Sequence, residues 1–261
     1  MKPIVYTNKG PVRDHNEDVV FVAGNIISGC SLTAPFEVNA ENSKGCCVVI
    51  DGMGGYEGGE MAARLVAMSF LDSAEGWDIT AREGRTKVDN ILRNAVRRIV
   101  AVADENPALS SMGAALAGVA FCSDAALIFN CGDCRVYCQN GEHLEKLSHD
   151  HSVVQELYDH GKIDEDGMRV HPRKNIVTAC VSREPTFLNI YFREIPYAQE
   201  KQNFFICSDG VWEALAVNEL EICLANKTNF KSAGFLVEKL LGAGEKCHDN
   251  ISFLLVEIDS E

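Results

Sequence analysis

The chain has 261 residues, an apolar fraction of 46% and a formal net charge of −14 at pH 7. That charge argues against electrostatic binding to nucleic acid or to an anionic membrane. It would also repel a free anionic substrate unless a metal ion or an arginine inverted the local field. Eleven cysteines, an odd number that lies mostly in apolar runs, indicate buried reduced thiols and not a disulfide framework.

Nothing in the sequence indicates a membrane protein or a chain of several domains. No window is apolar enough to span a membrane, and the opening Met-Lys-Pro-Ile-Val-Tyr is not typical of a signal peptide. We therefore expect a cytoplasmic protein. Without a linker, an internal repeat or a low-complexity tract, we predict one domain over 1–261.

The predicted elements form blocks of strands and blocks of helices. Apolar runs predict strands near 3–7, 18–23, 46–50, 115–122, 125–131, 134–138, 188–193, 203–207 and 251–258. Helical periodicity appears at 58–73, 85–104, 151–160, 217–225 and 231–241. This order favours an α+β fold of antiparallel sheets faced by helices over β-α-β alternation.

Two polar segments are predicted to be loops. Residues 24–44 are small and polar, and residues 159–175 carry glycine, proline and mixed charge between a helix and an apolar run. The second segment is either a mobile flap beside an active site or a solvated surface loop.

Acidic residues stand next to several strands. Residues 13–18, Arg-Asp-His-Asn-Glu-Asp, precede the run VVFVA, and the run at 46–50 ends at Asp51. After Asp51 come several glycines and then a helical pattern, which reads as a strand, a tight turn and a helix start. Glycines let the backbone approach a ligand closely, so we expect a hard cation and the phosphate that it holds.

Two further acids, Asp209 and Asp249, flank the runs at 203–207 and 251–258. Acids at strand ends can converge on one rim of a pair of sheets, where they would repel strongly without a cation. Oxygen ligands of this kind suit Mg²⁺ or Mn²⁺ better than zinc. The alternative is that each aspartate only caps a helix or makes a turn, as is common beside glycine.

Other motifs are less specific. The glycine-rich turn lacks the G-x-G-x-x-G and G-K-[ST] spacings of nucleotide-binding loops, and the chain has no G-x-S-x-G elbow. Cys131-Gly132-Asp133-Cys134 is a single C-x-x-C between two apolar runs, which favours a hairpin turn over a redox or zinc site. His149-Asp150-His151 precedes a helical pattern, which favours a helix cap over a metal cluster.

The ordered set of motifs resembles a known family. They are RDHNED (13–18), DGMGG (51–55), GDCR (132–135), DHS (150–152), CSDG (207–210) and DN (249–250). Together they are similar to the metal-dependent protein Ser/Thr phosphatases of the PP2C (PPM) family, and more to its bacterial branch. The resemblance implies an αββα sandwich of two antiparallel sheets flanked by helices, with a pair of metal ions at one rim.

The resemblance also implies roles for residues of this chain. Asp51 would bridge two Mg²⁺ or Mn²⁺ ions, the Gly52 carbonyl would bind one of them, and Asp209 and Asp249 would hold the other. Glu17 and Asp18 would act mainly through metal-bound water, and Arg13 would clamp the substrate phosphate.

The implied reaction is hydrolysis of phosphoserine and phosphothreonine in proteins. Two cations a few ångströms apart lower the pKa of a shared water and orient it for in-line attack on phosphorus. Arg13, with its planar fork, meets the charge on the phosphoryl oxygens. No protein nucleophile is needed.

Some positions depart from the family pattern. Met53 stands where many eukaryotic members carry histidine, so a general acid is absent there. The acid that would bind a third metal appears only as Ser110 or Ser111, although Glu213 matches the other position for that metal, so a third ion is doubtful. Cys134 replaces a serine, which packing should tolerate.

Three functions stay open at this point. The first is the protein phosphatase, acting on a phosphoprotein, opposing a Ser/Thr kinase and working as a monomer. The second is a weakly active or inactive regulatory or binding module of the same fold, which Met53, the missing acid and the Ala114-Ala115 pair would favour. The third is a hydrolase of small phosphate esters.

Overall fold

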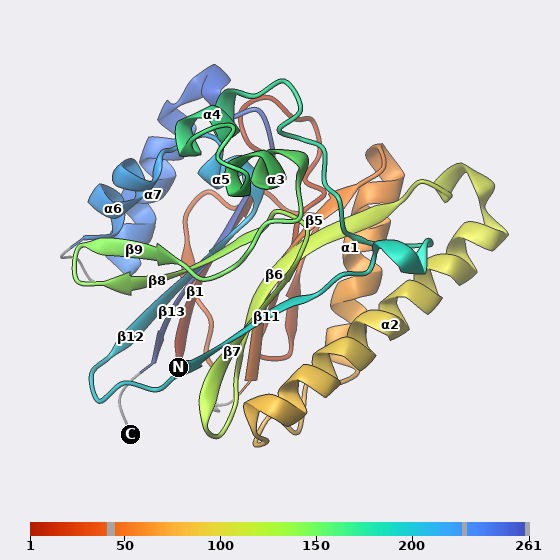
Figure 1. Ribbon diagram of the computed structural model, residues 1–261, viewed down its shortest axis with the longest axis horizontal. Coiled ribbons are helices and arrows are strands. Elements are labelled where there is room, and N and C mark those ends of the chain that lie inside the picture. Colours follow the sequence, from red (N-terminus) through yellow and green to blue (C-terminus); the bar gives the residue numbers. More distant parts are fainter. Residues whose placement is uncertain (41–44, 226–228, 259–261) are drawn as a thin grey trace.

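Two antiparallel β-sheets pack face to face in the computed structural model, which describes residues 1–40, 45–225 and 229–258 (Figure 1). Within these residues the first sheet has six strands, in the order β4 (Phe36–Glu37), β1 (Lys2–Asn8), β13 (Ile251–Ile258), β12 (Gln202–Cys207), β8 (Arg135–Asn140) and β9 (His143–Lys146). The second has seven, in the order β11 (Tyr191–Pro196), β7 (Ala125–Cys131), β6 (Gly113–Phe121), β5 (Gly45–Met53), β2 (Val19–Val22) and β3 (Asn25–Ile27), with β10 (Val181–Ser182) beside β6. The α+β fold with two antiparallel sheets is confirmed.

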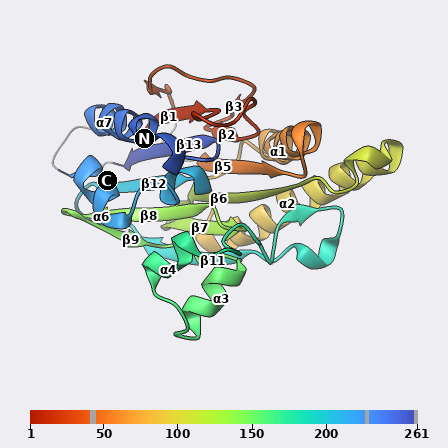
Figure 2. The ribbon, with the colours of Figure 1, turned by 90° about the horizontal axis from the view of Figure 1, so that it is seen from above.

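The described residues form seven helices, most of which cover the outer faces of the two sheets. They are α1 (Tyr56–Leu71), α2 (Ala81–Glu105), α3 (Val153–Asp159), α4 (Glu165–Val170), α5 (Asp209–Trp212), α6 (Val217–Leu224) and α7 (Asn229–Gly242), with short 3₁₀ turns at Pro107–Leu109, Pro185–Phe187 and Gly244–Lys246. Figure 2 shows α6 and α7 on one side of the sheets and α1 and α2 on the other, with α3 and α4 standing out from these layers. The layers are those of an αββα sandwich.

Strand β5 shows how a continuous apolar run forms the middle of this sandwich. Val48 and Ile50 pack into the core beneath α1 and α2, whereas Cys47 and Val49 pack into the core between the two sheets. Because successive side chains of a strand point to opposite faces, Asp51 falls on the side between the sheets. The strand therefore delivers its terminal acid to the rim of the inter-sheet layer.

Helices α1 and α2 lie on the same side of this strand, and each begins at a defined N-terminal cap. Helix α1 starts directly after the glycine turn, with Gly55 as its N-terminal cap. Helix α2 starts at a capping box in which Thr80 accepts the Glu83 backbone N–H and the Glu83 carboxylate accepts the Thr80 N–H. Its apolar side packs on the same core as α1.

Several short elements were not predicted. Strands β3 and β4 lie within the predicted loop at 24–44, of which residues 41–44 are outside the described part, and α4 lies within the predicted loop at 159–175. Strands β9 and β10 and helix α5 are also additional. Across the described residues, no helix combines the length and the apolar character needed to cross a membrane.

Candidate metal-binding cleft

A cleft of about 210 Å³ opens where β5 leaves the inter-sheet layer. Its lining residues are Arg13, Glu17, Asp51, Gly52, Met53, Gly54, Gly55, Asp133, Asn175, Val177, Asp209, Asp249 and Asn250. The structure thus brings together all the residues predicted from the sequence except Asp18. That residue is buried, with 1% of its surface exposed, and its charge still acts on Asp51.

The acids of the cleft repel one another. Burial, followed by the charge of Asp209, raises the pKa of Asp51 well above its usual value. Burial, followed by the charges of Asp133 and Asp249, does the same to the pKa of Asp209. Burial also raises the pKa of Asp18 to about 7. Acids crowded in this way favour a bound cation, because its charge removes the repulsion.

Two carboxylate oxygens in this region lack any hydrogen-bond partner. They are Oδ1 of Asp18 and Oδ1 of Asp209, both shielded from solvent. The second oxygen of Asp18 accepts the Ser208 hydroxyl at 2.9 Å, which fixes the carboxylate. Buried polar atoms are rarely left unpaired, and free carboxylate oxygens are the ligands that Mg²⁺ and Mn²⁺ prefer. The chemistry of these donors therefore fits the divalent ions that the sequence predicts.

The carboxylate of Asp249 is already engaged by its neighbours. Its Oδ2 accepts Arg13 Nη2 at 2.6 Å, and its Oδ1 accepts the backbone N–H of Asn250 at 2.8 Å. The described residues accordingly contain no group of three or more His, Cys, Asp or Glu side chains already assembled to hold a metal ion. Arg13 is half exposed and lines the cleft, so its guanidinium lies within the cleft while it is paired with Asp249.

Two glycines let three segments meet at the floor of the cleft. A side chain at Gly52 would collide with the Gly59 carbonyl of α1 and would lie 2.8 Å from the Glu17 carbonyl. A side chain at Gly59 would lie 2.8 Å from the Gly52 carbonyl and would also meet the Glu17 carboxylate. Both positions therefore require glycine, and the Gly52 backbone can face a ligand without a side chain in the way.

These pKa shifts predict that the metal-free protein loses stability as the pH rises. Asp18 and Asp133 have a pKa of about 7 in the folded protein, with burial as the main cause, whereas an unfolded carboxyl titrates near about 4. Between those values the folded state binds more protons, so the free energy of unfolding falls with increasing pH up to about 7.

Thermal unfolding in EDTA at about pH 5.5 and about pH 8 measures this effect. We expect a lower Tm at the higher pH, and we expect added Mn²⁺ to reduce the difference. A metal-free Tm that is equal or higher at the higher pH would contradict the electrostatic description of the cleft.

Among the lining residues that were not predicted as site residues, three carry an acidic or amide side chain. Asp133 and Asn250 belong to motifs that the sequence analysis quoted without giving these two side chains a role, and Asn175 lies at the end of the predicted flap. Asp133 is 4% exposed and lies two positions after Cys131, the last residue of β7. An acid just past an apolar run is the same signal that identified Asp51 and Asp209.

The prediction of a hairpin at Cys131-Gly132-Asp133-Cys134 is wrong. Strand β7 pairs with β6 and β11, and β8 pairs with β12 and β9, so this segment crosses from the second sheet to the first. Both thiols are free and buried. The crossing places Asp133 between the sheets, at the cleft.

The preference for a helix cap at 149–152 is confirmed. Ser152 caps α3 by accepting the Gln155 N–H at 3.2 Å. Asp150 instead forms a buried ion pair with Arg135 at 2.6 Å. His149 pairs with Asp159 at 3.3 Å, so these side chains are used within the fold.

Beside Glu213, the residue that matches a third-metal position of the family, the structure places a lysine. Glu213 follows α5 and forms an ion pair with Lys174, from the end of the 159–175 segment. Ser111 lies against the glycine turn, where a side chain at Gly54 would come within 2.7 Å of its carbonyl. The ammonium group of Lys174 thus supplies the positive charge beside Glu213.

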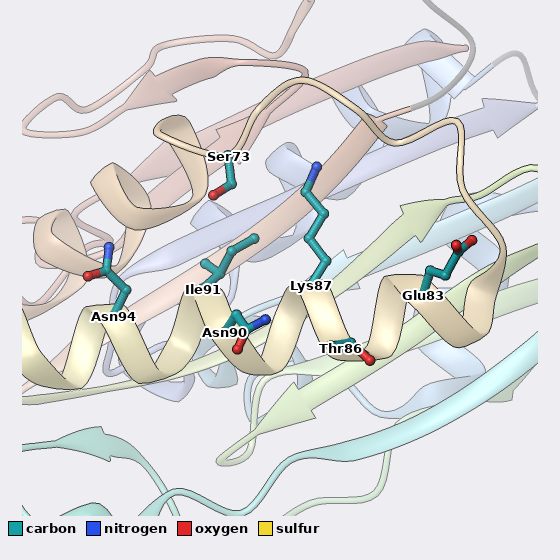
Figure 3. A pocket seen from close by; sticks show the side chains of 7 residues that line it. All are labelled: Ser73, Glu83, Thr86, Lys87, Asn90, Ile91 and Asn94. Carbon is teal, nitrogen blue, oxygen red and sulfur yellow. The ribbon is translucent and has the colours of Figure 1, made fainter.

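Another hollow, of about 500 Å³, lies on the outer helices, between the end of α1 and α2 (Figure 3). Its cation, Lys87, already donates to the carbonyls of Glu75 and Gly76 and lies 4.4 Å from the centre of the Trp77 ring. Apart from Glu83, which caps α2, its lining side chains are uncharged or engaged. It offers no group of acids comparable to the cleft.

Comparison with known proteins agrees with this geometry. Residues 35–241 match the sequence model of the protein phosphatase 2C family. The serine/threonine phosphatase Stp of Listeria monocytogenes is 30% identical over 97% of this chain and 94% of its own length. The fold resembles that of the Mycobacterium tuberculosis serine/threonine phosphatase PstP/Ppp, with a TM-score of 0.79, 22% identity and coverage of 99% and 100% of the two chains. The catalytic domain of PstP has also been solved in complex with 2 manganese ions, with a TM-score of 0.76, 23% identity and coverage of 99% and 100%.

Proposed function

Because the chain belongs to the protein phosphatase 2C family of metal-dependent serine/threonine phosphatases, we propose that it hydrolyses phosphoserine and phosphothreonine in proteins, with water as the nucleophile. The observation that carries the proposal is the cleft itself. It gathers Asp51, Asp209 and Asp249 with Arg13 at one rim. None of the residues that line the described cleft is a serine, threonine, cysteine or histidine, so these residues supply no hydroxyl, thiol or imidazole nucleophile.

We assign the metal ligands as the sequence predicts. Asp51 would be shared by two ions, the Gly52 carbonyl would complete one site, and Asp209 and Asp249 the other, with Glu17 and Asp18 acting through water. Two Mg²⁺ or Mn²⁺ ions would supply a water of lowered pKa and positive charge for the phosphoryl oxygens.

The chain's own contribution to the reaction is to bind and orient the phosphoryl group. Arg13 can donate two parallel N–H bonds to it, and a charged fork of this kind matches two oxygens of a phosphate. Its charge also offsets the repulsion from a protein with a net charge of −14. Met53 lines the cleft without a proton to give, so the leaving oxygen must receive its proton from another source.

We propose two ions and not three, because Lys174 neutralises Glu213 and no acid stands at Ser110 or Ser111. The same contact supports the segment at 159–175 as a flap, because it joins the end of that segment to the residue four positions after Asp209. Four further points remain predictions: a single domain over 1–261, a monomeric state, an opposing Ser/Thr kinase and a cytoplasmic location.

Turnover of phosphopeptides tests the proposed function. With Mn²⁺, we expect release of phosphate from phosphoserine and phosphothreonine peptides, and loss of activity in EDTA. The kcat/KM for these peptides should exceed that for small metabolite phosphate esters. Absence of turnover at saturating Mn²⁺ would favour the inactive module, and a preference for small esters would favour a metabolite phosphatase.

A further inference from the structure

Asn250 is a buried residue of the cleft, and its side-chain hydrogen bonds all go to one loop, residues 9–17. It is 5% exposed and follows Asp249 at the start of β13. Its Oδ1 accepts the backbone N–H of Glu17 at 2.8 Å, and its Nδ2 donates to the carbonyls of His15 at 2.8 Å and Lys9 at 3.0 Å. One carboxamide thus uses its acceptor and both N–H donors on the segment 9–17.

In the sequence, the backbone groups that hydrogen-bond to Asn250 lie on both sides of Arg13. Lys9 lies on one side of Arg13, and His15 and Glu17 lie on the other. Arg13 itself is half exposed, and it touches the same strand start by donating to the His248 carbonyl at 3.2 Å and to Asp249. Arg13 also ties this strand start to the loop, but a bound phosphate would compete for its hydrogen bonds.

Resting on the proposed function, we propose that Asn250 is a positioning residue that fixes the 9–17 loop on the strand carrying Asp249, and so aims the Arg13 guanidinium at the phosphoryl group. An amide is required because the site needs one acceptor and two donors together. Aspartate would keep the acceptor for Glu17 and lose both donors. Alanine would leave three backbone groups without their partner.

A second asparagine provides a matched control. Asn130 is also fully buried, and its Nδ2 donates to the carbonyls of Gly132 at 3.2 Å and His149 at 2.8 Å, while its Oδ1 accepts the His149 N–H at 3.2 Å. It therefore makes the same number and kind of bonds as Asn250. None of these bonds reaches the 9–17 loop.

A double-mutant cycle with Arg13 separates positioning from general stability. Arg13→Ala should lower kcat/KM for a phosphopeptide about 10- to 100-fold, the usual value of a charged hydrogen bond. Asn250→Ala should lower it about tenfold, mainly by raising KM, because a misaimed group loses binding to the phosphate. In the Arg13→Ala background, Asn250→Ala should cost less than about twofold. Asn130→Ala should cost the same factor in both backgrounds.

Two measurements do not depend on turnover. Inorganic phosphate titrated into the Mn²⁺-loaded protein should bind about tenfold more weakly to Asn250→Ala than to wild type. Hydrogen exchange of the metal-free protein should show the Glu17 amide slow in wild type and in Asn130→Ala, and fast in Asn250→Ala. If Asn250→Ala does not fold, Asn250→Asp is the variant used, with the same expectations for kcat/KM and phosphate binding, whereas its carboxylate still accepts the Glu17 N–H and should keep that amide slow.

The outcomes are distinct. An equal loss from Asn250→Ala with and without Arg13, or unchanged phosphate binding, would overturn the positioning role. A wild-type protein with no Mn²⁺-dependent turnover would overturn the proposed function, and hydrogen exchange and phosphate binding would still decide whether Asn250 holds the loop.

Discussion

Asp51→Asn is expected to abolish Mn²⁺-dependent hydrolysis of phosphate esters while the fold is retained. Asparagine has the same shape and keeps the pairing of β5 with Ala115 of β6. It removes the charge that stands among Asp209, Asp18 and Asp249, and with it the acid that we propose is shared by two cations. Since bound metal contributes several kcal/mol to the transition state, kcat/KM should fall by about 10³ or more.

Hydrolysis of an aryl phosphate, Mn²⁺ binding by calorimetry and thermal unfolding together check this expectation. The metal-free variant should be at least as stable as wild type, because a buried repulsion is removed. Asp89→Asn makes the same chemical change at a site exposed on α2, where the acid pairs with Arg93, and should keep activity within about twofold. Full activity in Asp51→Asn would rule out the two-metal mechanism.

Asp150→Ala is expected to cost about 3 to 5 kcal/mol of unfolding free energy, because it leaves a buried cation without its partner. Arg135 and Asp150 are 3% and 0% exposed, and two guanidinium nitrogens donate to one carboxylate oxygen at 2.9 and 2.6 Å. Burial alone would lower the pKa of Arg135, but Asp150 raises it above its usual value, so the side chain stays charged. Its guanidinium also lies 3.6 Å from the centre of the Trp212 ring.

Loss of the Arg135–Asp150 ion pair should also disturb the cleft. Trp212 donates its indole N–H to the Asp133 carbonyl at 3.0 Å, so the Arg135 pair supports both the sheet crossing and α5, which begins at Asp209. Urea denaturation followed by circular dichroism measures the loss. Asp89→Ala, which breaks an exposed pair, should cost less than about 1 kcal/mol.

A second variant separates the ion pair from the packing around it. Arg135→Met combined with Asp150→Ala removes both charges and should recover part of the stability lost in Asp150→Ala. The interpretation fails if Asp150→Ala alone stays within about 1 kcal/mol of wild type, or if the double variant is no more stable than the single one.

The main strands and helices could be predicted because their apolar patterns are local. Strand β5 is buried on both faces and therefore reads as a continuous run, and α2 shows helical periodicity over most of its length, although it begins at Ala81, before the predicted start at 85. Helix α5 has only four residues, too few to show helical periodicity. The error at Cys131–Cys134 has a different cause, since a tight glycine turn looks the same whether the next strand joins the same sheet or the other one.

The acids of the site could be predicted because each stands at the end of a core strand, where Asp51 and Asp209 meet the rim. The polar residues that hold them could not. Asn250 acts through backbone groups of Lys9, His15 and Glu17, which are more than two hundred positions away in the sequence. Lys174 and Glu213 are 39 positions apart in the sequence, and only the fold brings them into an ion pair.

A structure of crystals soaked in Mn²⁺ tests the two-metal site most directly, because anomalous scattering counts the ions and locates them. We expect two ions in the cleft, with Asp51 touching both, the Gly52 carbonyl on one, and Asp209 and Asp249 on the other. An Asp51 that contacts no ion, or manganese bound only outside the cleft, would contradict the account.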